Sequence, residues 1–255
     1  MGNFIQIKTE GIKNYIAVTE KPFSKVLMLE QKLNLHRFSL EKQYKQSEIF
    51  YDTSTNLLSK AGILLSKTIS PEKTYFKVER QSTLLKSYAR KKETVFIHEV
   101  GVRDKVMDHA FFLVDGIKAL FTTQFTIDLE NVLKNIFPKI VVDSNVDKWN
   151  VMSGGGFKGS IYFQTSKINN LESKRKNHFK AMKVQLESPD TYLPSFNYLI
   201  EQIEKHCKTF IETDESIYDY CLRLTKPLPP KQKLTKEEKE KLKQQKKKSE
   251  NNIQG

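Results

Sequence analysis

Two short runs of alternating apolar and polar residues constrain the fold of this chain most strongly. In residues 26–35, the odd positions carry four leucines, whereas the even positions include Met28, Glu30 and Lys32. Residues 178–187 repeat the pattern, with an apolar face opposite a face of lysine, glutamine and glutamate. A period of two is typical of a β-strand with one buried face. The polar faces can point to water from an open sheet or line the lumen of a closed barrel, and periodicity does not distinguish these cases.

The remaining segments predict a mixed fold dominated by short strands. Asp128 is a good N-cap for one of the predicted helices, and Ser153–Gly156 predicts a hairpin turn. Further strands are expected at 63–68, 74–80, 91–100, 139–143, 147–153 and 158–166. Helices are expected at 39–49, 104–121, 128–136 and 195–212, and residues 214–225 are helical or irregular. The predicted class is therefore α+β, with eight antiparallel strands in a β-barrel and flanking helices.

The charge of the chain points to an anionic partner. The formal net charge is +13 over 255 residues. Residues 226–255 hold ten lysines and four glutamates, so this tail accounts for +6 and the rest of the chain for +7. A basic body favours a nucleotide, a polyphosphate, nucleic acid or an acidic protein, although a solvated lysine-rich surface gives the same composition. The tail is expected to be disordered or a solvated helix that can contact nucleic acid through charge alone.

The sequence also indicates the compartment and the domain boundaries. The two cysteines form no disulfide framework or CxxC pair, which favours a reducing compartment. No apolar run approaches the roughly 18 residues that a membrane span needs, and we found no signal peptide. We therefore expect a cytoplasmic protein without a membrane partner. The expected organisation is an N-terminal extension at 1–25, a barrel domain at 26–226 and a basic tail at 227–255.

Several segments, taken in order, resemble the CYTH superfamily of triphosphate tunnel proteins, and thiamine-triphosphatase-like members in particular. The most specific is Phe50–Thr53 followed by Leu58 and Ala61–Leu65, which is similar to a tyrosine- and aspartate-containing segment of that family. Four shorter segments add to the resemblance in the same order: Glu30–Lys32, Tyr75–Arg80, His178–Glu187 and Ser216–Tyr218.

The resemblance implies an eight-stranded antiparallel tunnel in which basic residues hold a triphosphate and carboxylates hold Mg²⁺ or Mn²⁺. The candidate phosphate-binding residues are Lys32, Lys77, Lys139 and Lys183, of which Lys183 stands at an acidic-type position of the family. The matching carboxylates, as candidate metal ligands, are Glu30, Glu79 and Glu187. Arginine binds phosphate with a planar fork that lysine lacks, and magnesium prefers carboxylates, waters and substrate oxygens.

Several positions depart from the family pattern. Met28 stands in place of the first glutamate, and Ser66–Thr68 stands in place of an Arg-x-Arg segment, with Lys67 facing away from the tunnel. Ser166 stands in place of an aspartate, and Gln185 occupies an acidic-type position. Each lost charge-stabilising donor commonly costs about 100- to 1,000-fold in rate, so a divalent metal is expected to bind weakly and no catalytic residue is assigned.

Two functions follow, from different classes. The first is a degenerate tunnel that binds a phosphoanion, or serves as a scaffold for a protein partner, with weak or lost catalysis. The second is an active metal-dependent triphosphate hydrolase whose clamp is rebuilt from lysines. Thiamine triphosphate, tripolyphosphate, long polyphosphate, ATP and an RNA 5′ end present similar phosphates, so the substrate stays open.

Overall fold

A computed structural model describes residues 2–7, 12–17, 36–80, 93–121, 128–153, 158–186, 193–206, 209–213 and 215–226. The chain divides into two compact units, residues 1–225 and 226–255, and every element described below belongs to the first. The predicted strand at 26–35 lies outside the described residues, as does nearly all of the predicted tail.

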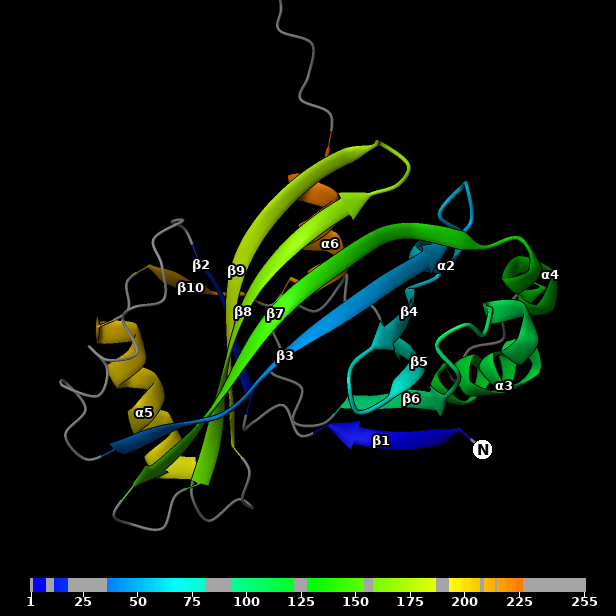
Figure 1. The fold of residues 1–255 in the computed structure, drawn as a ribbon. Coiled ribbons are helices and arrows are strands. Elements are labelled where there is room, and N and C mark those ends of the chain that lie inside the picture. Colours follow the sequence, from blue (N-terminus) through cyan, green and yellow to red (C-terminus); the bar gives the residue numbers. More distant parts are fainter. Residues whose placement is uncertain are drawn as a thin grey trace, which may run out of the picture. The chain divides into compact units, whose positions relative to one another are not determined.

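Ten described strands form one antiparallel sheet in the order β1-β6-β5-β4-β3-β7-β8-β9-β2-β10 (Figure 1). Every neighbouring pair is antiparallel. The strands are β1 (Asn3–Ile7), β2 (Ile12–Ala17), β3 (His36–Asp52), β4 (Ile63–Ile69), β5 (Thr74–Arg80), β6 (Glu93–Glu99), β7 (Phe137–Ser153), β8 (Lys158–Asn170), β9 (Arg175–Leu186) and β10 (Phe210–Glu212).

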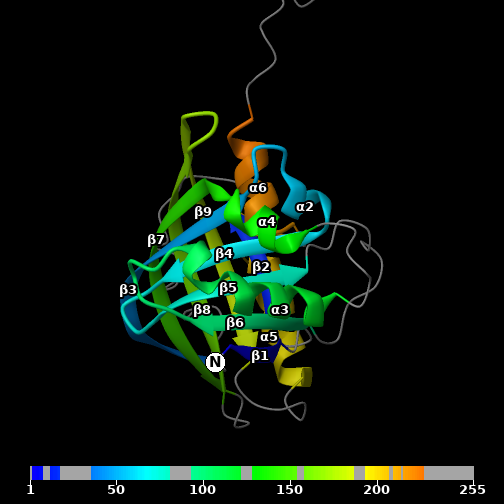
Figure 2. The ribbon, with the colours of Figure 1, turned by 90° about the vertical axis from the view of Figure 1, so that its right-hand side faces the viewer.

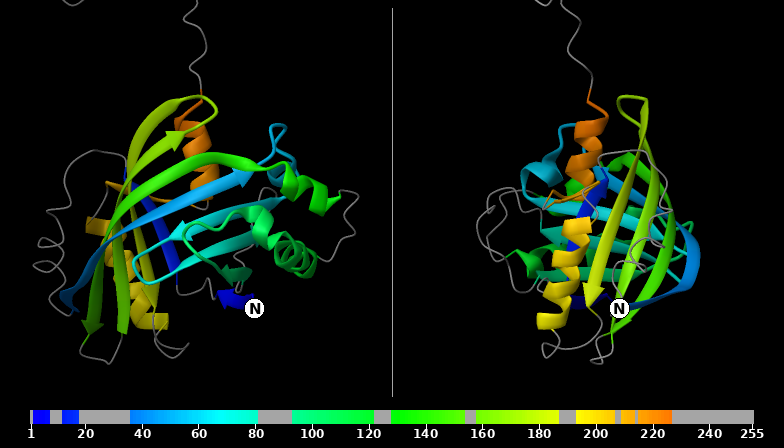
Figure 3. Two further views of the ribbon diagram at one scale, coloured as in Figure 1. Left: turned by 45° about the vertical axis from the view of Figure 1, so that its right-hand side comes forward. Right: turned by 90° about the vertical axis from the view of Figure 1, so that its left-hand side faces the viewer.

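Short helices pack on both faces of this sheet. They are α2 (Leu57–Lys60), the 3-10 helix η2 (Val106–His109), α3 (Ala110–Leu120), α4 (Leu129–Lys134), α5 (Leu193–His206) and α6 (Ile217–Leu224). In Figure 2, α3 and α4 lie in front of β4, β5 and β6. In Figure 3, α5 lies against the end of the sheet that contains β2 and β9.

The sheet is curled, with an outer face covered by α3, α4 and α5 and a concave face that receives α6. On the outer face, Phe76 and Val78 pack with α3 and α4 in one cluster, and Ile161 and Val184 pack with α5 in another. On the concave face, Leu64 of β4 joins residues of β7, β8, β9 and α6 in a third cluster. Strands β4 and β9 are four steps apart in the strand order, so only a curled sheet brings them to one helix.

The structure confirms several sequence predictions. Strands β4, β5 and β6 and helices α3 and α4 lie at or close to their predicted places. The side chain of Asp128 accepts a hydrogen bond from the backbone N–H of Asn131, as an N-cap does. The alternation in β9 is also confirmed for Met182–Leu186, because Met182 and Val184 lie in the core beneath α5.

Four predictions about the elements need correction. Residues 39–49 are not helical but form the middle of β3, where both faces are polar and the period of two is therefore hidden. The two strands expected at 139–153 are one strand, β7, because its polar centre pairs without a break. The helix predicted at 195–212 ends at His206, and β10 follows it. The described sheet has ten strands rather than the expected eight. Residues expected to be an N-terminal extension supply β1 and β2, and β3 and β10 were not predicted as strands either.

Candidate functional site

A row of basic side chains crosses the concave face on four adjacent strands. Lys42 of β3 pairs with Lys148 of β7, Lys148 pairs with Tyr162 of β8, and Tyr162 pairs with Lys183 of β9. The Nζ atom of Lys183 lies 4.3 Å from the centre of the Tyr162 ring, and that of Lys148 lies 5.8 Å from it. Directly paired side chains on one face are close neighbours, so this row concentrates positive charge around one aromatic ring. We call these four residues the lysine row.

Lys183 is the electrostatically strained member of the lysine row. Its pKa is lowered to about 8, chiefly by burial and further by the charges of Lys77 and Lys148. Among the described residues no carboxylate forms an ion pair with it. The ammonium of Lys183 is therefore a desolvated cation beside other cations, and among the described groups the face of the Tyr162 ring stabilises it.

The other two lysines of the row are paired with carboxylates. Lys148 Nζ lies 2.7 Å from Glu41 Oε2, and Lys42 forms an ion pair with Glu72. Glu41 is the residue at which the register of β3 against β7 shifts, and Glu72 lies in the exposed turn before β5. These two carboxylates offset part of the positive charge of the lysine row.

Lys77 of β5 lies on the same face but in a different electrostatic environment. Its Nζ is 3.1 Å from Glu48 Oε1 and 3.2 Å from Glu79 Oε1, and the hydroxyl of Ser66 donates to Glu48 Oε1 at 3.0 Å. Burial works to lower the pKa of Lys77, but the two carboxylates outweigh it and hold this pKa above its ordinary value. The predicted inward placement of Lys77 and Glu79 fits this geometry.

Lys139 has a different environment. It lies at a shift in the register of β7 against β3, between Pro138, which pairs with Tyr51, and Ile140, which pairs with Phe50. Its buried Nζ lies 2.9 Å from Glu172 Oε2 and 4.8 Å from the centre of the Phe137 ring. The structure therefore gives Lys139 an ion pair that holds the turn between β8 and β9, and its place in the phosphate site stays a prediction.

The positions of β4 that replace the family's arginines follow the expected alternation. Ser66 pairs directly with Lys77 and so shares its face. Lys67 points to the outer face, where its Nζ donates to the carbonyl oxygens of Val102 and Asp104 at 2.8 and 2.6 Å. Lys67 thus holds the loop before η2, as its predicted orientation away from the tunnel requires.

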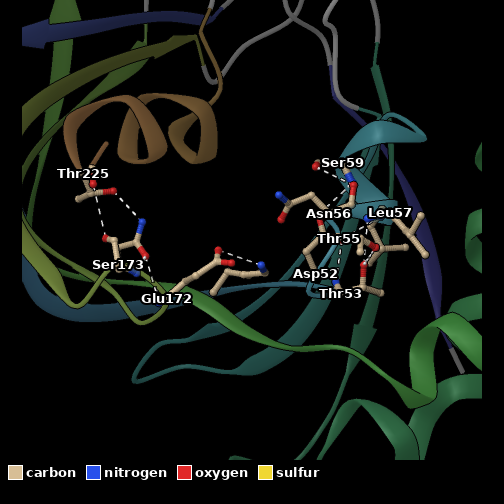
Figure 4. Close-up of polar contacts among 12 residues, drawn as sticks. Asp52, Thr53, Thr55, Asn56, Leu57, Ser59, Glu172, Ser173 and Thr225 are labelled. Atoms are coloured by element: carbon tan, nitrogen blue, oxygen red, sulfur yellow. Dashed lines mark hydrogen bonds and ion pairs between the residues drawn. The ribbon is translucent and has the colours of Figure 1, made fainter. Parts of the chain in front are cut away.

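The segment that carries the most specific resemblance is structural. The buried carboxylate of Asp52 accepts backbone hydrogen bonds from Thr53, Leu58 and Ser59 at 2.8, 2.9 and 3.1 Å (Figure 4). Thr53 Oγ1 accepts another from the N–H of Leu57 at 3.0 Å. These bonds fix the turn from β3 into α2, so the segment shapes one end of the curled sheet and supplies no group to the lysine row.

Hydrogen bonds hold helix α6 beside the same end of the curled sheet. The amide of Asn170 donates to Thr225 Oγ1 at 2.8 Å and its carbonyl oxygen accepts from Ser173 N at 2.9 Å. Figure 4 shows Glu172, Ser173 and Thr225 beside α6. Tyr218 and Cys221 of α6 are buried against the concave face. The concave face is therefore apolar and covered near α6, and cationic along the lysine row.

Three predicted site residues, Glu30, Lys32 and Glu187, lie outside the described residues. Sequence reasoning missed Lys42, Lys148, Tyr162 and Glu48. Lys42 and Glu48 fall in the segment predicted as a helix, which hid their shared face. Lys148 and Tyr162 were detectable only through the register of β7 on β8, which sequence does not give.

The carboxylates of the described concave face do not fit a resident divalent metal. Within the described part of the chain, no three histidine, cysteine or acidic side chains come together as a metal site. Glu48 and Glu79 both bond the ammonium of Lys77, which takes the place that a cation between them would need. We therefore derive no catalytic step through Mg²⁺ or Mn²⁺.

A curled antiparallel sheet with a cationic concave face and a helix at one end is the CYTH-like, triphosphate-tunnel type of fold. No family model matches the chain, and no curated protein matches it in sequence. Among solved structures, a proposed adenylate cyclase from Bacillus halodurans is 10% identical with a TM-score of 0.51, over 84% of this chain and 98% of that one. At this identity the likeness concerns the fold alone.

Two further solved structures have lower TM-scores. HpAC1 from Hippeastrum, a proposed adenylyl cyclase with a dominant triphosphatase activity, is 12% identical with a TM-score of 0.49, over 86% of this chain and 97% of that one. The Pct1 RNA triphosphatase from S. pombe is 9% identical with a TM-score of 0.29, over 78% of this chain and 83% of that one. Among the described helices, none is long and apolar enough to cross a membrane.

Proposed function

We propose that this protein binds a phosphoanion, such as a triphosphate, a polyphosphate or a nucleotide, on the concave face of its sheet, with weak or lost catalysis. The observation that carries the proposal is the lysine row, and above all Lys183, which has two cationic neighbours and no described carboxylate partner. An anion bound there removes the repulsion among these lysines and supplies the missing counter-charge.

The shape of the concave face supports a small or terminal phosphoanion. Phe179 and Ala181 precede Lys183 on the same face of β9, and they pack with Tyr218 and Cys221 of α6. The anion therefore meets an apolar wall on one side of the row. We also propose that the curled sheet is a closed or nearly closed barrel, because Lys77 and Lys183 repel each other although β5 and β9 are five steps apart in the strand order.

The proposed loss of catalysis rests on the groups around Lys77. The carboxylate predicted as a metal ligand, Glu79, is bonded to Lys77, and so is Glu48. Ser66 stands where an arginine would bind the phosphate, and its hydroxyl donates a hydrogen bond to Glu48 instead. Lysines attract phosphate as point charges but do not give the two-pronged geometry that arginine gives. This combination favours binding over phosphoryl transfer.

Isothermal titration calorimetry with tripolyphosphate tests the binding. We expect binding that weakens with added salt and that Lys183→Ala weakens on the order of tenfold. The matched control is Lys176→Ala, an exposed lysine on the same strand, which should leave the affinity unchanged. No binding by the wild type, or an equal effect of the two variants, contradicts the assignment of the lysine row.

A phosphate-release assay with tripolyphosphate and Mg²⁺ or Mn²⁺ tests the catalytic part. We expect turnover far below the roughly 10 per second of a typical enzyme. Turnover in the typical range shows the alternative, a hydrolase whose clamp is rebuilt from lysines. If neither binding nor turnover is found, the remaining function is that of a scaffold for a protein partner.

A further inference from the structure

We propose that Lys183 is a nucleophilic amine that forms an imine with a small aldehyde carrying a phosphate group. The proposal rests on the proposed anion binding and adds to it a ligand class and a covalent step. It starts from a difference among the four described lysines that share the concave face. Lys42, Lys77 and Lys148 each have a carboxylate at ion-pair distance, and Lys183 has none among the described residues.

The position of Lys183 favours its neutral form. The side chain is half-buried on β9, its Nζ lies above the Tyr162 ring, and both Lys77 and Lys148 repel its charge. A lysine that is desolvated beside another cation is activated as a nucleophile in this way. Burial and repulsion together lower its pKa to about 8, so an appreciable fraction of the amine is free at neutral pH.

The neighbours of Lys183 explain why the aldehyde should carry a phosphate. Tyr162 and Lys148 occupy the next two strands at the same level of the sheet, and Lys42 follows on the third. A phosphate held by Lys148 places the aldehyde of the same small molecule over the Tyr162 ring, toward Lys183. The phosphate also adds a second counter-charge to Lys148 beside that of Glu41. The aldehyde converts the Lys183 amine into an imine, so both changes reduce the repulsion between the two lysines.

The chemistry of the step is complete without any further reactant. The lone pair of the neutral Lys183 amine attacks the aldehyde carbon, a C–N bond forms, and the carbonyl oxygen takes up a proton. One amine proton is lost as that oxygen becomes a hydroxyl group, and the second amine proton leaves together with the hydroxyl group as water, which gives the imine. The Tyr44 and Tyr162 hydroxyls lie on the same face as the amine, but the step needs neither of them as a catalyst.

The test uses the full-length wild-type protein and pyridoxal 5′-phosphate as the probe. The imine is reduced with borohydride at neutral pH, and labelled lysines are located by peptide mass spectrometry. We expect Lys183 to be labelled on the order of tenfold more than exposed lysines such as Lys176. Pyridoxal, which lacks the phosphate, should label Lys183 far less, and Lys183→Arg should remove the label while keeping the positive charge.

The outcomes separate this proposal from the proposed function. Labelling spread evenly over surface lysines overturns the assignment of a nucleophilic amine, whatever the calorimetry with tripolyphosphate shows. Equal labelling of Lys183 by the two aldehydes overturns the phosphorylated ligand class. Selective labelling by pyridoxal 5′-phosphate that tripolyphosphate suppresses supports both the amine and the anion site. Because the mapping is done on the wild type, a poorly folding Lys183→Arg variant does not affect the decision.

Discussion

Replacing Lys183 by methionine should stabilise the protein at neutral pH. In the wild type, the folded chain keeps a cation among other cations, and this cation is better solvated in the unfolded chain. The lowered pKa means that the unfolded state binds the proton more tightly than the folded state. The penalty is therefore present in full below pH 8 and disappears as the pH rises from about 8 toward the ordinary lysine value, so this group makes stability rise across that window.

The size of the effect follows from the shift. A fall from the ordinary value of 10.5 to about 8 corresponds to about 3 kcal/mol at roughly 1.4 kcal/mol per pKa unit. The contact of the ammonium with the Tyr162 ring offsets about 0.5 to 2 kcal/mol of this, and methionine retains most of the packing of the stem. We expect Lys183→Met to raise the free energy of unfolding by about 1 to 2 kcal/mol at pH 7.

Urea denaturation at pH 7 and pH 10 measures this directly. The midpoint of Lys183→Met should rise at pH 7 with an unchanged m-value, and the gain should shrink at pH 10. Lys176→Met, on the exposed part of the same strand, should show no such gain. A destabilised Lys183→Met protein, or a gain of the same size at both pH values, refutes the electrostatic reasoning.

Three further predictions concern other parts of the molecule. Asp52→Ala removes the acceptor of three backbone N–H groups and should lower the free energy of unfolding by about 2 to 4 kcal/mol in urea titrations; Asp52→Asn, which keeps one acceptor oxygen, should lose less, and equal losses contradict the argument. Glu48→Gln leaves Lys77 with one carboxylate and should cost about 1 to 3 kcal/mol at pH 7. Because this pair raises the Lys77 pKa, the loss should persist across neutral pH and shrink only above the ordinary lysine range; a loss that vanishes near pH 8 contradicts it. Truncation after residue 226 should leave the melting temperature within a few degrees of the full chain in calorimetry, since a lysine-rich tail cannot bury a core, and a larger fall shows that the tail packs.

Local sequence signals predicted the elements of the fold better than their pairing. The cap at Asp128 and the alternation around Val184 involve neighbours in sequence, and both were predictable. Strand β3 was missed because its outer positions, such as Gln43 and Lys45, are as polar as its concave positions. Its partner β7 defines it as a strand, and that partner lies far along the chain.

The candidate site shows the same division. The predicted inward placement of Lys77 and Lys183 on the concave face follows from counting residues along one strand. The face of Lys139 cannot be counted in the same way, because the register of β7 against β3 shifts at this residue and one residue decides the face. Which charges approach a lysine from a distant strand, as Lys77 approaches Lys183, depends on the curl of the whole sheet and cannot be derived from any single segment.

The long pairing of β3 with β7 has a consequence for how the chain folds. This ladder runs from His36 against Ser153 to Asp52 against Phe137, and it is the seam that joins the β4–β6 part of the sheet to the β8–β9 part. Partners along it are separated by 85 to 117 residues, so closing it requires a large loss of chain entropy before its contacts form. During synthesis, β3 must wait unpaired on that side until β7 leaves the ribosome. Its charged side chains, including Glu41 and Lys45, protect that unpaired edge from pairing with another chain.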